Sequence, residues 1–369
     1  MSATTTSPGH HTGDRTADAM IDAAVLDEVL HAIDLHSDVL MTWDYERSRH
    51  ALVKLYEKAK TSQWNGNDLP WDIEVDAEKL AASGSAAQRF GVLSGHPDSP
   101  LRSWGAADWQ VFQVEQQKFT LSQFLHGEQG ALVCTGLITS TTPWIDAKYY
   151  AATQVMDEAR HVEVFARYLD EKLDGAYPIN DNLGGLLDTI VEDGRWDITY
   201  LGMQIMVEGL ALAAFGFMHM LSQEPLLKQL LRYVMSDEAR HVAFGVLSLK
   251  ELYDGLGAAE IRERQEFAYE AAVRLKRRFS GGEVFARLGA DPKAVLSFLD
   301  ANQDPNQLVF QQMLFSKIVP NCKKLGLLDA GDGWLREQFT GLGIIEFEDG
   351  INAVDEYELL DAVASDEAS

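Results

Sequence analysis

The sequence predicts an all-α fold, and three observations support this prediction. Apolar residues recur at helical spacing through several long segments, without convincing strand-like alternation. Two short links join four of these segments into two pairs. Between the pairs lies a segment long enough to cross the length of a helix. Together these features predict two antiparallel helical hairpins joined by a long crossover, with extra N- and C-terminal helices.

The region before the predicted bundle is less regular. The chain begins with MSATTTSPGHHTGDRTAD, a polar stretch that we expect to form a disordered tail over residues 1–20. The following region, 21–104, is predicted to start with a helix over 21–62. A Gly-, Ser- and Pro-rich stretch then predicts a loop that contains a short helix.

The four bundle segments lie within a predicted domain over residues 105–255. Their expected helices cover 108–138, 144–173, 197–222 and 225–254. Thr142 and Pro143 lie in the first link, and Ser222 and Pro225 in the second. Each pair suits a helix N-cap followed by an early proline. Each short link therefore predicts an antiparallel hairpin.

The crossover and the C-terminal part follow from the remaining segments. Residues 175–196 are long enough to connect the hairpins as in a ferritin-like four-helix bundle. A C-terminal helical extension is predicted over 256–350, with helices near 258–280 and 305–323. The basic run at 274–280 is typical of a solvated helix face. Residues 351–369 are acidic and predict a tail or a small docking helix.

Composition narrows the functional classes. The 369 residues, 46% of them apolar, suit one large globular domain with appendages. The net charge of −26 opposes binding to nucleic acid or to an anionic membrane surface. The chain has neither a long uninterrupted apolar run nor the apolar core of a signal peptide, so no membrane span or secretion is predicted. Cys134 and Cys322 offer no disulfide framework, which fits a cytoplasmic protein.

The sequence Asp-Glu-Ala-Arg-His occurs twice, on two of the predicted bundle helices. It pairs Glu158 with His161 and Glu238 with His241. Residues three apart share one face of a helix, so each pair can direct a carboxylate and an imidazole at one point. A single Glu-x-x-His is more typical of a surface charge pair, so the partner helix of each hairpin provides the test.

Each partner helix supplies a glutamate at the same spacing. Glu128 precedes Glu158 by thirty residues, and Glu208 precedes Glu238 by thirty. The hairpin links lie midway, so antiparallel packing brings each pair to the same depth. Both positions have apolar neighbours, among which a carboxylate needs a partner. Acids make up 57 of 369 residues, so chance would place acids at both positions only about a few per cent of the time.

Four glutamates and two histidines around one point form a site with oxygen and nitrogen ligands and four negative charges. Burying these charges without cations would be costly, and two divalent ions would neutralise them. The alternatives are a structural polar network and a bundle that metal merely stabilises. We predict that six residues bind two metal ions and carry the catalysis: Glu128, Glu158, His161, Glu208, Glu238 and His241.

The other charged residues of the repeat are predicted to support these ligands. A metal-bound histidine donates its second ring N–H to a carboxylate. Asp157 and Asp237 are placed to accept this N–H from the histidine of the opposite helix. Arg160 and Arg240 are predicted to orient the aspartates, and ion pairs on the bundle surface are the alternative.

The order Glu, Glu-x-x-His, Glu, Glu-x-x-His resembles the pattern of the ferritin-like di-iron carboxylate superfamily over about residues 105–255. The Asp-Glu-x-Arg-His form is most similar to hydroxylase subunits of bacterial multicomponent monooxygenases. The resemblance implies two iron ions, or a mixed manganese/iron pair, with O2 as co-substrate.

Three positions depart from related enzymes. Phe165 stands where ribonucleotide reductase small subunits have their radical-forming tyrosine. Leu212 stands where the monooxygenases have an active-site threonine, and Val234 replaces a histidine of the di-iron arylamine N-oxygenases. A radical-storing role and a strict N-oxygenase site are therefore not expected.

We predict a di-iron O2-dependent oxidoreductase, monooxygenase-like, that hydroxylates, desaturates or N-oxygenates a small hydrophobic or aromatic substrate. The alternative is a ferritin-like ferroxidase that handles iron without an organic substrate. The regions outside the bundle favour the oxygenase, because a bare bundle would need about half this length. We expect an electron-donating reductase or ferredoxin as a partner, and a homodimer.

Overall fold

The structure is a computed structural model that describes residues 30–35, 37–76, 80, 90–302 and 310–359. The chain divides into two compact units, Met1–Asp34 and Leu35–Ser369. In the first unit, residues 30–34 are described and form no regular element, and the predicted tail over 1–20 lies outside the described residues. The helices below belong to the second unit. The described residues contain no strand, which confirms the all-α prediction.

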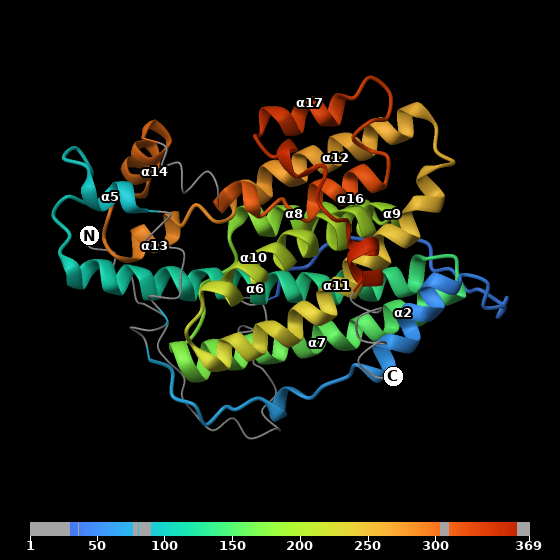
Figure 1. Ribbon diagram of the computed structural model, residues 1–369, viewed down its shortest axis with the longest axis horizontal. Coiled ribbons are helices and arrows are strands. Elements are labelled where there is room, and N and C mark those ends of the chain that lie inside the picture. The colour runs from blue at the N-terminus through green and yellow to red at the C-terminus, as the bar shows by residue number, and fades with distance from the viewer. Residues whose placement is uncertain (1–29, 36, 77–79, 81–89, 303–309, 360–369) are drawn as a thin grey trace. The chain divides into compact units, whose positions relative to one another are not determined.

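Four long helices form the bundle (Figure 1). They are α6 (Ala106–Thr141), α7 (Ile145–Leu173), a composite third helix (Trp196–Leu221) and α11 (Pro225–Tyr253). Helix α6 packs along α7, and the third helix packs along α11. Each short link therefore joins two helices into a hairpin. The predicted ferritin-like bundle of two hairpins is confirmed.

The third helix changes its winding along its length. It consists of α9 (Trp196–Tyr200), the π-helical segment η2 (Leu201–Val207) and α10 (Glu208–Leu221). Such π segments often occur at functional sites, and this one ends directly before Glu208. The helix is long and apolar enough to cross a membrane, but 83% of its most apolar stretch is buried inside the protein. It is therefore packed as a core helix.

The two hairpin links differ from the prediction in detail. Helix α7 begins two residues after Pro143, and Thr142 is instead the C-cap of α6. In the second link, Pro225 is the first residue of α11, as predicted. The N-cap is Glu224 rather than Ser222, because the Glu224 carboxylate accepts the backbone N–H groups of the second and third helical residues at 2.9 and 2.6 Å.

The crossover contains a helix that was not predicted, α8 (Asp181–Asp193). Asn180 caps its start by accepting the backbone N–H of Asn182 at 2.9 Å, and Gly194, with φ of 70°, ends it. Helix α8 packs against α6 and against α12 (Ala258–Arg277). The crossover therefore covers one side of the bundle as well as linking the hairpins.

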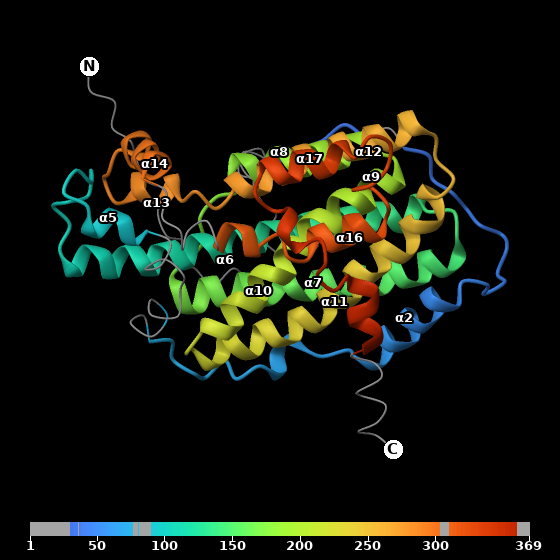
Figure 2. The same cartoon turned by 45° about the horizontal axis from the view of Figure 1, so that its top comes forward.

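The predicted helix over 21–62 is wrong for much of its described part. Among the described residues of this range, 50–61 form the helix α2 (His50–Thr61). Residues 30–35 and 37–49 are not helical. The backbone N–H of Leu40 donates to the Ser140 carbonyl at 2.8 Å, and Thr42 Oγ1 donates to the Pro143 carbonyl at 2.7 Å. These bonds to the α6–α7 link replace bonds that a helix would make. Helix α2 packs against α7 and α11 (Figure 2).

In the following loop, where a short helix was predicted, the described residues include α5 (Gly91–Gly95) and the helical Leu80, and 77–79 and 81–89 lie outside the described residues. Beyond α12, the C-terminal extension forms α13 (Gly282–Arg287), α14 (Pro292–Ala301), α16 (Ile318–Lys324) and α17 (Trp334–Gly341). The predicted helix over 305–323 is interrupted: residues 310–313 and α16 are helical, 314–317 form a turn, and 303–309 lie outside the described residues. A solvated helix face was predicted for the basic run at 274–280, and at Arg278, which is 1% exposed, that prediction is wrong. Helices α12 and α16 pack against η2, so the extension supports the third bundle helix.

The acidic C-terminal segment is helical over 353–359. Lys317 Nζ lies 2.6 Å from both carboxylate oxygens of Glu356. This part matches the predicted docking helix rather than a free tail, and 360–369 lie outside the described residues.

Candidate metal centre

All six predicted ligands meet inside the bundle, and we call them the ligand cluster. Each residue is at most 5% exposed. The thirty-residue spacing brings the glutamate of each first helix beside the Glu-x-x-His pairs. The cluster consists of Glu128 on α6, Glu158 and His161 on α7, Glu208 at the start of α10, and Glu238 and His241 on α11.

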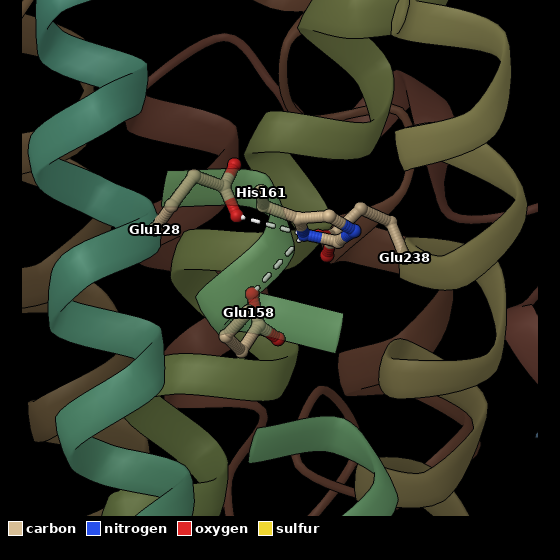
Figure 3. Close-up of side chains that lie close together, drawn as sticks. All are labelled: Glu128, Glu158, His161 and Glu238. Atoms are coloured by element: carbon tan, nitrogen blue, oxygen red, sulfur yellow. Dashed lines mark hydrogen bonds and ion pairs between the residues drawn. The ribbon is translucent and has the colours of Figure 1, made fainter. Parts of the chain in front are cut away.

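The first group of ligand atoms surrounds Nδ1 of His161 (Figure 3). This nitrogen lies 3.1 Å from Glu128 Oε2, 3.2 Å from Glu158 Oε2 and 3.1 Å from Glu238 Oε1. One ring nitrogen carries at most one proton, so it cannot bond fully to three carboxylates. The convergence of three carboxylates and one imidazole nitrogen is typical of a cation site.

The second group surrounds Nδ1 of His241. This nitrogen lies 2.9 Å from Glu158 Oε1 and 3.6 Å from Glu238 Oε2. Glu208 forms a group of possible metal ligands with Glu158 and His241. Glu158 and Glu238 thus present oxygens to both histidines, but only Glu158 belongs to both groups of ligand atoms, and Glu238 belongs to the first group. Glu128 belongs to the first group alone and Glu208 to the second.

Several buried polar atoms of the cluster have no hydrogen-bond partner. They include Oε2 of Glu158, Oε2 of Glu208, both carboxylate oxygens of Glu238, and Nδ1 of His241. The His241 atom lies close to Glu158 but not in hydrogen-bonding geometry. Unsatisfied buried polar atoms are costly and rare in native proteins. Two divalent ions would satisfy these atoms, and the oxygen and nitrogen donors suit iron or manganese.

The electrostatics of the cluster favour uptake of positive charge. Burial and the negative charge of Glu238 raise the pKa of Glu128 to about 8, and the same two causes raise the pKa of Glu208 well above its usual value. Burial lowers the pKa of His161, but the close carboxylates of Asp237, Glu128, Glu158 and Glu238 outweigh burial and raise the pKa well above its usual range. Without other cations the cluster holds protons, which divalent ions would displace.

Each histidine contacts the aspartate of the opposite helix through Nε2, the ring nitrogen that does not face the glutamates. His161 Nε2 lies 3.2 Å from Asp237 Oδ2, and His241 Nε2 lies 3.3 Å from Asp157 Oδ2. Both aspartates therefore lie where the sequence predicts them. With Nε2–H donated to an aspartate, the Nδ1 atom of each ring faces the carboxylates, and its lone pair would bind a metal that displaces the Nδ1 proton.

Arg160 and Arg240 lie beside both aspartates. Arg160 bonds to Asp157 and lies 3.3 Å from Asp237 Oδ2. Arg240 bonds to Asp237 and lies 3.5 Å from Asp157 Oδ2. The two arginine side chains are 6% and 4% exposed, so the alternative of surface ion pairs is wrong.

Gln154 is a member of the network that the sequence analysis missed. Its side-chain amide donates to Glu158 Oε1 at 3.0 Å and to Glu208 Oε1 at 2.9 Å. It lies four residues before Glu158, on the same face of α7. This spacing could have identified Gln154 from the sequence, because a polar residue one turn from a buried ligand faces the same site.

Two further side chains reach the aspartates from the irregular chain after α2. Gln63 donates to Asp157 Oδ1 at 3.1 Å, and the Trp64 indole donates to Asp237 Oδ2 at 2.7 Å. Arg160 lies over the Trp64 ring, 4.7 Å from its centroid. No periodic pattern covers this segment, so the local sequence could not identify these residues.

A small cavity, with room for about one water-sized group, adjoins the cluster. It is lined by Phe124, Gly127, Glu128, Ala131, Val207, Glu208, Ala211, Glu238 and Arg278. Phe165, at the position of the radical-forming tyrosine, packs near Phe124 and Phe215, with ring centroids 6.4 and 5.7 Å away. Leu212 and Val234 are also buried. These departures therefore belong to the apolar packing around the site.

The geometry joins one glutamate from each of two helices to a Glu-x-x-His pair from each of the other two. This is the ligand arrangement of the ferritin-like di-metal carboxylate proteins.

Comparison with known proteins adds a likeness to solved structures. No family model and no curated protein matches the chain. An R2-like ligand-binding oxidase with an aerobically reconstituted metal cofactor is 16% identical, with a TM-score of 0.47, and the match covers 79% of this chain and 99% of that one. A variant with an anaerobically reconstituted Mn/Fe cofactor is 18% identical, with a TM-score of 0.46 and coverages of 82% and 99%. At such identities and TM-scores, the function has to be inferred from the site itself.

Proposed function

We propose that this protein is an O2-activating non-haem di-metal oxygenase that acts on a small hydrophobic or aromatic molecule. The paired cluster carries the proposal: Glu158 and Glu238 each present oxygens to both histidines, and a cavity adjoins the cluster. Three ligands and several apolar side chains line this cavity. A purely structural metal site is closed and has no need of such a cavity.

The donor set suits two iron ions or a mixed manganese/iron pair. Glu128 and His161 would bind one ion and Glu208 and His241 the other. Glu158 and Glu238, which face both histidines, would contribute ligands to both. When bound, the metal pair would supply the redox chemistry that reduces O2 and oxidises a substrate.

The protein's own residues prepare the site. Asp237 and Asp157 accept the Nε2–H of the two histidines, which keeps each Nδ1 directed at the carboxylates. Gln154 holds one oxygen of Glu158 and one of Glu208. The near-complete burial of the ligands excludes bulk water, which strengthens every electrostatic interaction in the site.

The partners follow from this chemistry. Repeated turnover with O2 needs an external source of electrons, so we propose a reductase or ferredoxin as the electron donor. A homodimer and a cytoplasmic location remain part of the proposal. The apolar side chains beside the ligand cluster, among them Phe124, Val207 and Ala211, support a hydrophobic or aromatic substrate.

Anaerobic reconstitution of the full chain with Fe(II), followed by O2 and a chemical reductant, tests the proposal. We expect two metal ions per chain by elemental analysis, and O2 uptake that continues while reductant is supplied. A ferroxidase would instead accumulate many irons per chain.

Two variants serve as a matched pair in this test. His241→Ala should bind about one metal ion fewer while its circular dichroism remains helical. His219→Ala, at a partly exposed position near the end of α10, should keep both ions. If the wild-type chain binds no metal, the proposed function is wrong.

A further inference from the structure

The motif Tyr-x-x-x-Gln-x-x-x-Glu occurs twice in the bundle, and each copy ends at a glutamate of the ligand cluster. The first copy covers 150–158 on α7, and the second covers 200–208 on the third bundle helix. The Tyr150 and Tyr200 rings both pack against Phe244, with ring centroids 4.4 and 5.0 Å from that of the phenylalanine. The two copies therefore lie close together, at one level of the bundle.

The second copy contains buried polar groups that other protein groups do not satisfy. Gln204 is completely buried, yet neither its amide nitrogen nor its amide oxygen has a hydrogen-bond partner within the described chain. The same is true of the Tyr200 hydroxyl, four residues before it, and of Glu208 Oε2, four residues after it. In the first copy, by contrast, the Gln154 amide donates to two glutamates of the cluster. Buried polar groups without a protein partner are usually bonded to ordered water.

Two more hydroxyl groups extend this set toward the surface. Burial raises the pKa of Tyr200, and the side chains of Ser248 and Thr142 act in the opposite direction, which places them beside the phenol. Both are buried, and neither hydroxyl has a hydrogen-bond partner among the described residues. Thr142 lies in the α6–α7 link and is followed by two partly exposed residues. We call the side chains of Thr142, Ser248, Tyr200 and Gln204 the polar track.

The buried ligand cluster needs a supply of protons. Insertion of one oxygen atom of O2 into a substrate releases the other atom as water, which takes two protons and two electrons. The electrons come from the proposed donor, and the protons come from solvent. Each ligand residue is at most 5% exposed, so bulk water does not reach the cluster directly. Hydroxyl groups and ordered water can pass protons through such a core.

We propose that the polar track carries protons from the α6–α7 link to Glu208 at the metal centre. This inference rests on the proposed function of the same site. Ordered water bonded to the hydroxyls and to the Gln204 amide would satisfy these groups, and each proton would move along water and hydroxyl groups. The amide does not itself take up the proton. It holds the water molecule at the last step before Glu208, whose Oε2 has no other partner within the described chain.

Stopped-flow mixing of Fe(II)-loaded protein with O2, in H2O and in D2O, tests the proposal. Tyr200→Phe and Gln204→Leu should bind two metal ions, as the wild type does. They should oxidise their metal at least about tenfold more slowly and show a larger ratio of the rates in H2O and D2O. Tyr253→Phe is the matched control and should behave as the wild type. The Tyr253 hydroxyl is also buried without a hydrogen-bond partner in the described chain, but it lies near Asp197 and Arg264 rather than in the track.

A high-resolution crystal structure of the metal-free protein gives a readout that does not depend on turnover. Ordered water should bond to the Gln204 amide and to the Tyr200 hydroxyl. Wild-type rates and isotope effects in both variants would overturn the proposal, as would an ordered crystal whose polar track contains no water. Wild-type protein that binds no metal would instead show that the proposed function has failed, and the crystal would still test the track.

Discussion

Glu128→Gln should change the stability of this protein in opposite directions with and without metal. Glu128 is a buried carboxylate that lies near Glu238 and the other ligands. In metal-free protein, ionisation of Glu128 places a negative charge next to other buried carboxylates, which repel it and destabilise the folded state. Glutamine has nearly the same shape and does not ionise. The metal-free variant should therefore be more stable than the wild type at high pH, and the metal-loaded variant less stable.

The magnitude follows from the pKa of Glu128. Burial and the charge of Glu238 raise that pKa from its ordinary 4.5 to about 8 in the folded protein. Below pH 4.5 the carboxyl is protonated in both folded and unfolded states. As the pH rises from 4.5 to 8, the unfolded state loses this proton first, so the free energy of unfolding falls. At about 1.4 kcal/mol per pKa unit, the total loss is at most about 5 kcal/mol, and the glutamine variant does not suffer it.

Urea denaturation followed by circular dichroism measures this effect at pH 5 and pH 8, with a chelator and again with Mn(II). In chelator, the advantage of Glu128→Gln should grow between the two pH values. With Mn(II), the wild type should gain stability, about 2.7 kcal/mol at a hundredfold excess over Kd, and the variant less. Glu192→Gln, at an exposed position on α8, is the control and should show neither change. A metal-free Glu128→Gln protein less stable than the wild type at pH 8 would refute this reasoning.

Three further substitutions test the support of the site and the fold. Asp237→Asn should weaken metal binding by about 10- to 100-fold, because it removes the charged acceptor of the His161 N–H; competition with a chromophoric chelator measures this, and unchanged affinity would exclude the supporting role. Gly245→Ala should cost about 1–3 kcal/mol in thermal denaturation, because its Cβ would lie 2.6 Å from Gln204 Cβ; an unchanged Tm would contradict the close packing of α11 on η2. Glu224→Ala should cost about 1–2 kcal/mol by removing the N-cap of α11, which urea denaturation would detect or disprove.

The bundle helices could be predicted from the sequence because their apolar pattern spans many turns. Helix α11 begins at the predicted Pro225, and α7 begins one residue after the predicted 144. The residues before α2 could not be predicted in the same way. Hydrogen bonds between this segment and the distant α6–α7 link decide its path, and no local pattern encodes them. Helix α8 was missed because a segment of crossover length does not reveal how it packs.

The candidate site was predictable to the extent that it repeats along the chain. The two Asp-Glu-Ala-Arg-His copies and the thirty-residue spacing identified the six ligands and the four charged residues behind them as one set. Trp64 and Arg278 could not be found this way, since each comes from a segment outside the bundle that occurs once. Their positions depend on how α2 and α12 pack onto the bundle.

X-ray diffraction from crystals of the iron- and manganese-reconstituted protein, with anomalous data collected at the absorption edges of both metals, tests the two-metal site most directly. Two anomalous peaks should lie within the ligand cluster. One should be bound by Glu128 and His161, the other by Glu208 and His241, with Glu158 and Glu238 between them. An ordered crystal of reconstituted protein in which these residues bind no metal, and in which the cluster carboxylates bond only to protein groups, would show that the ligand cluster is not a metal site.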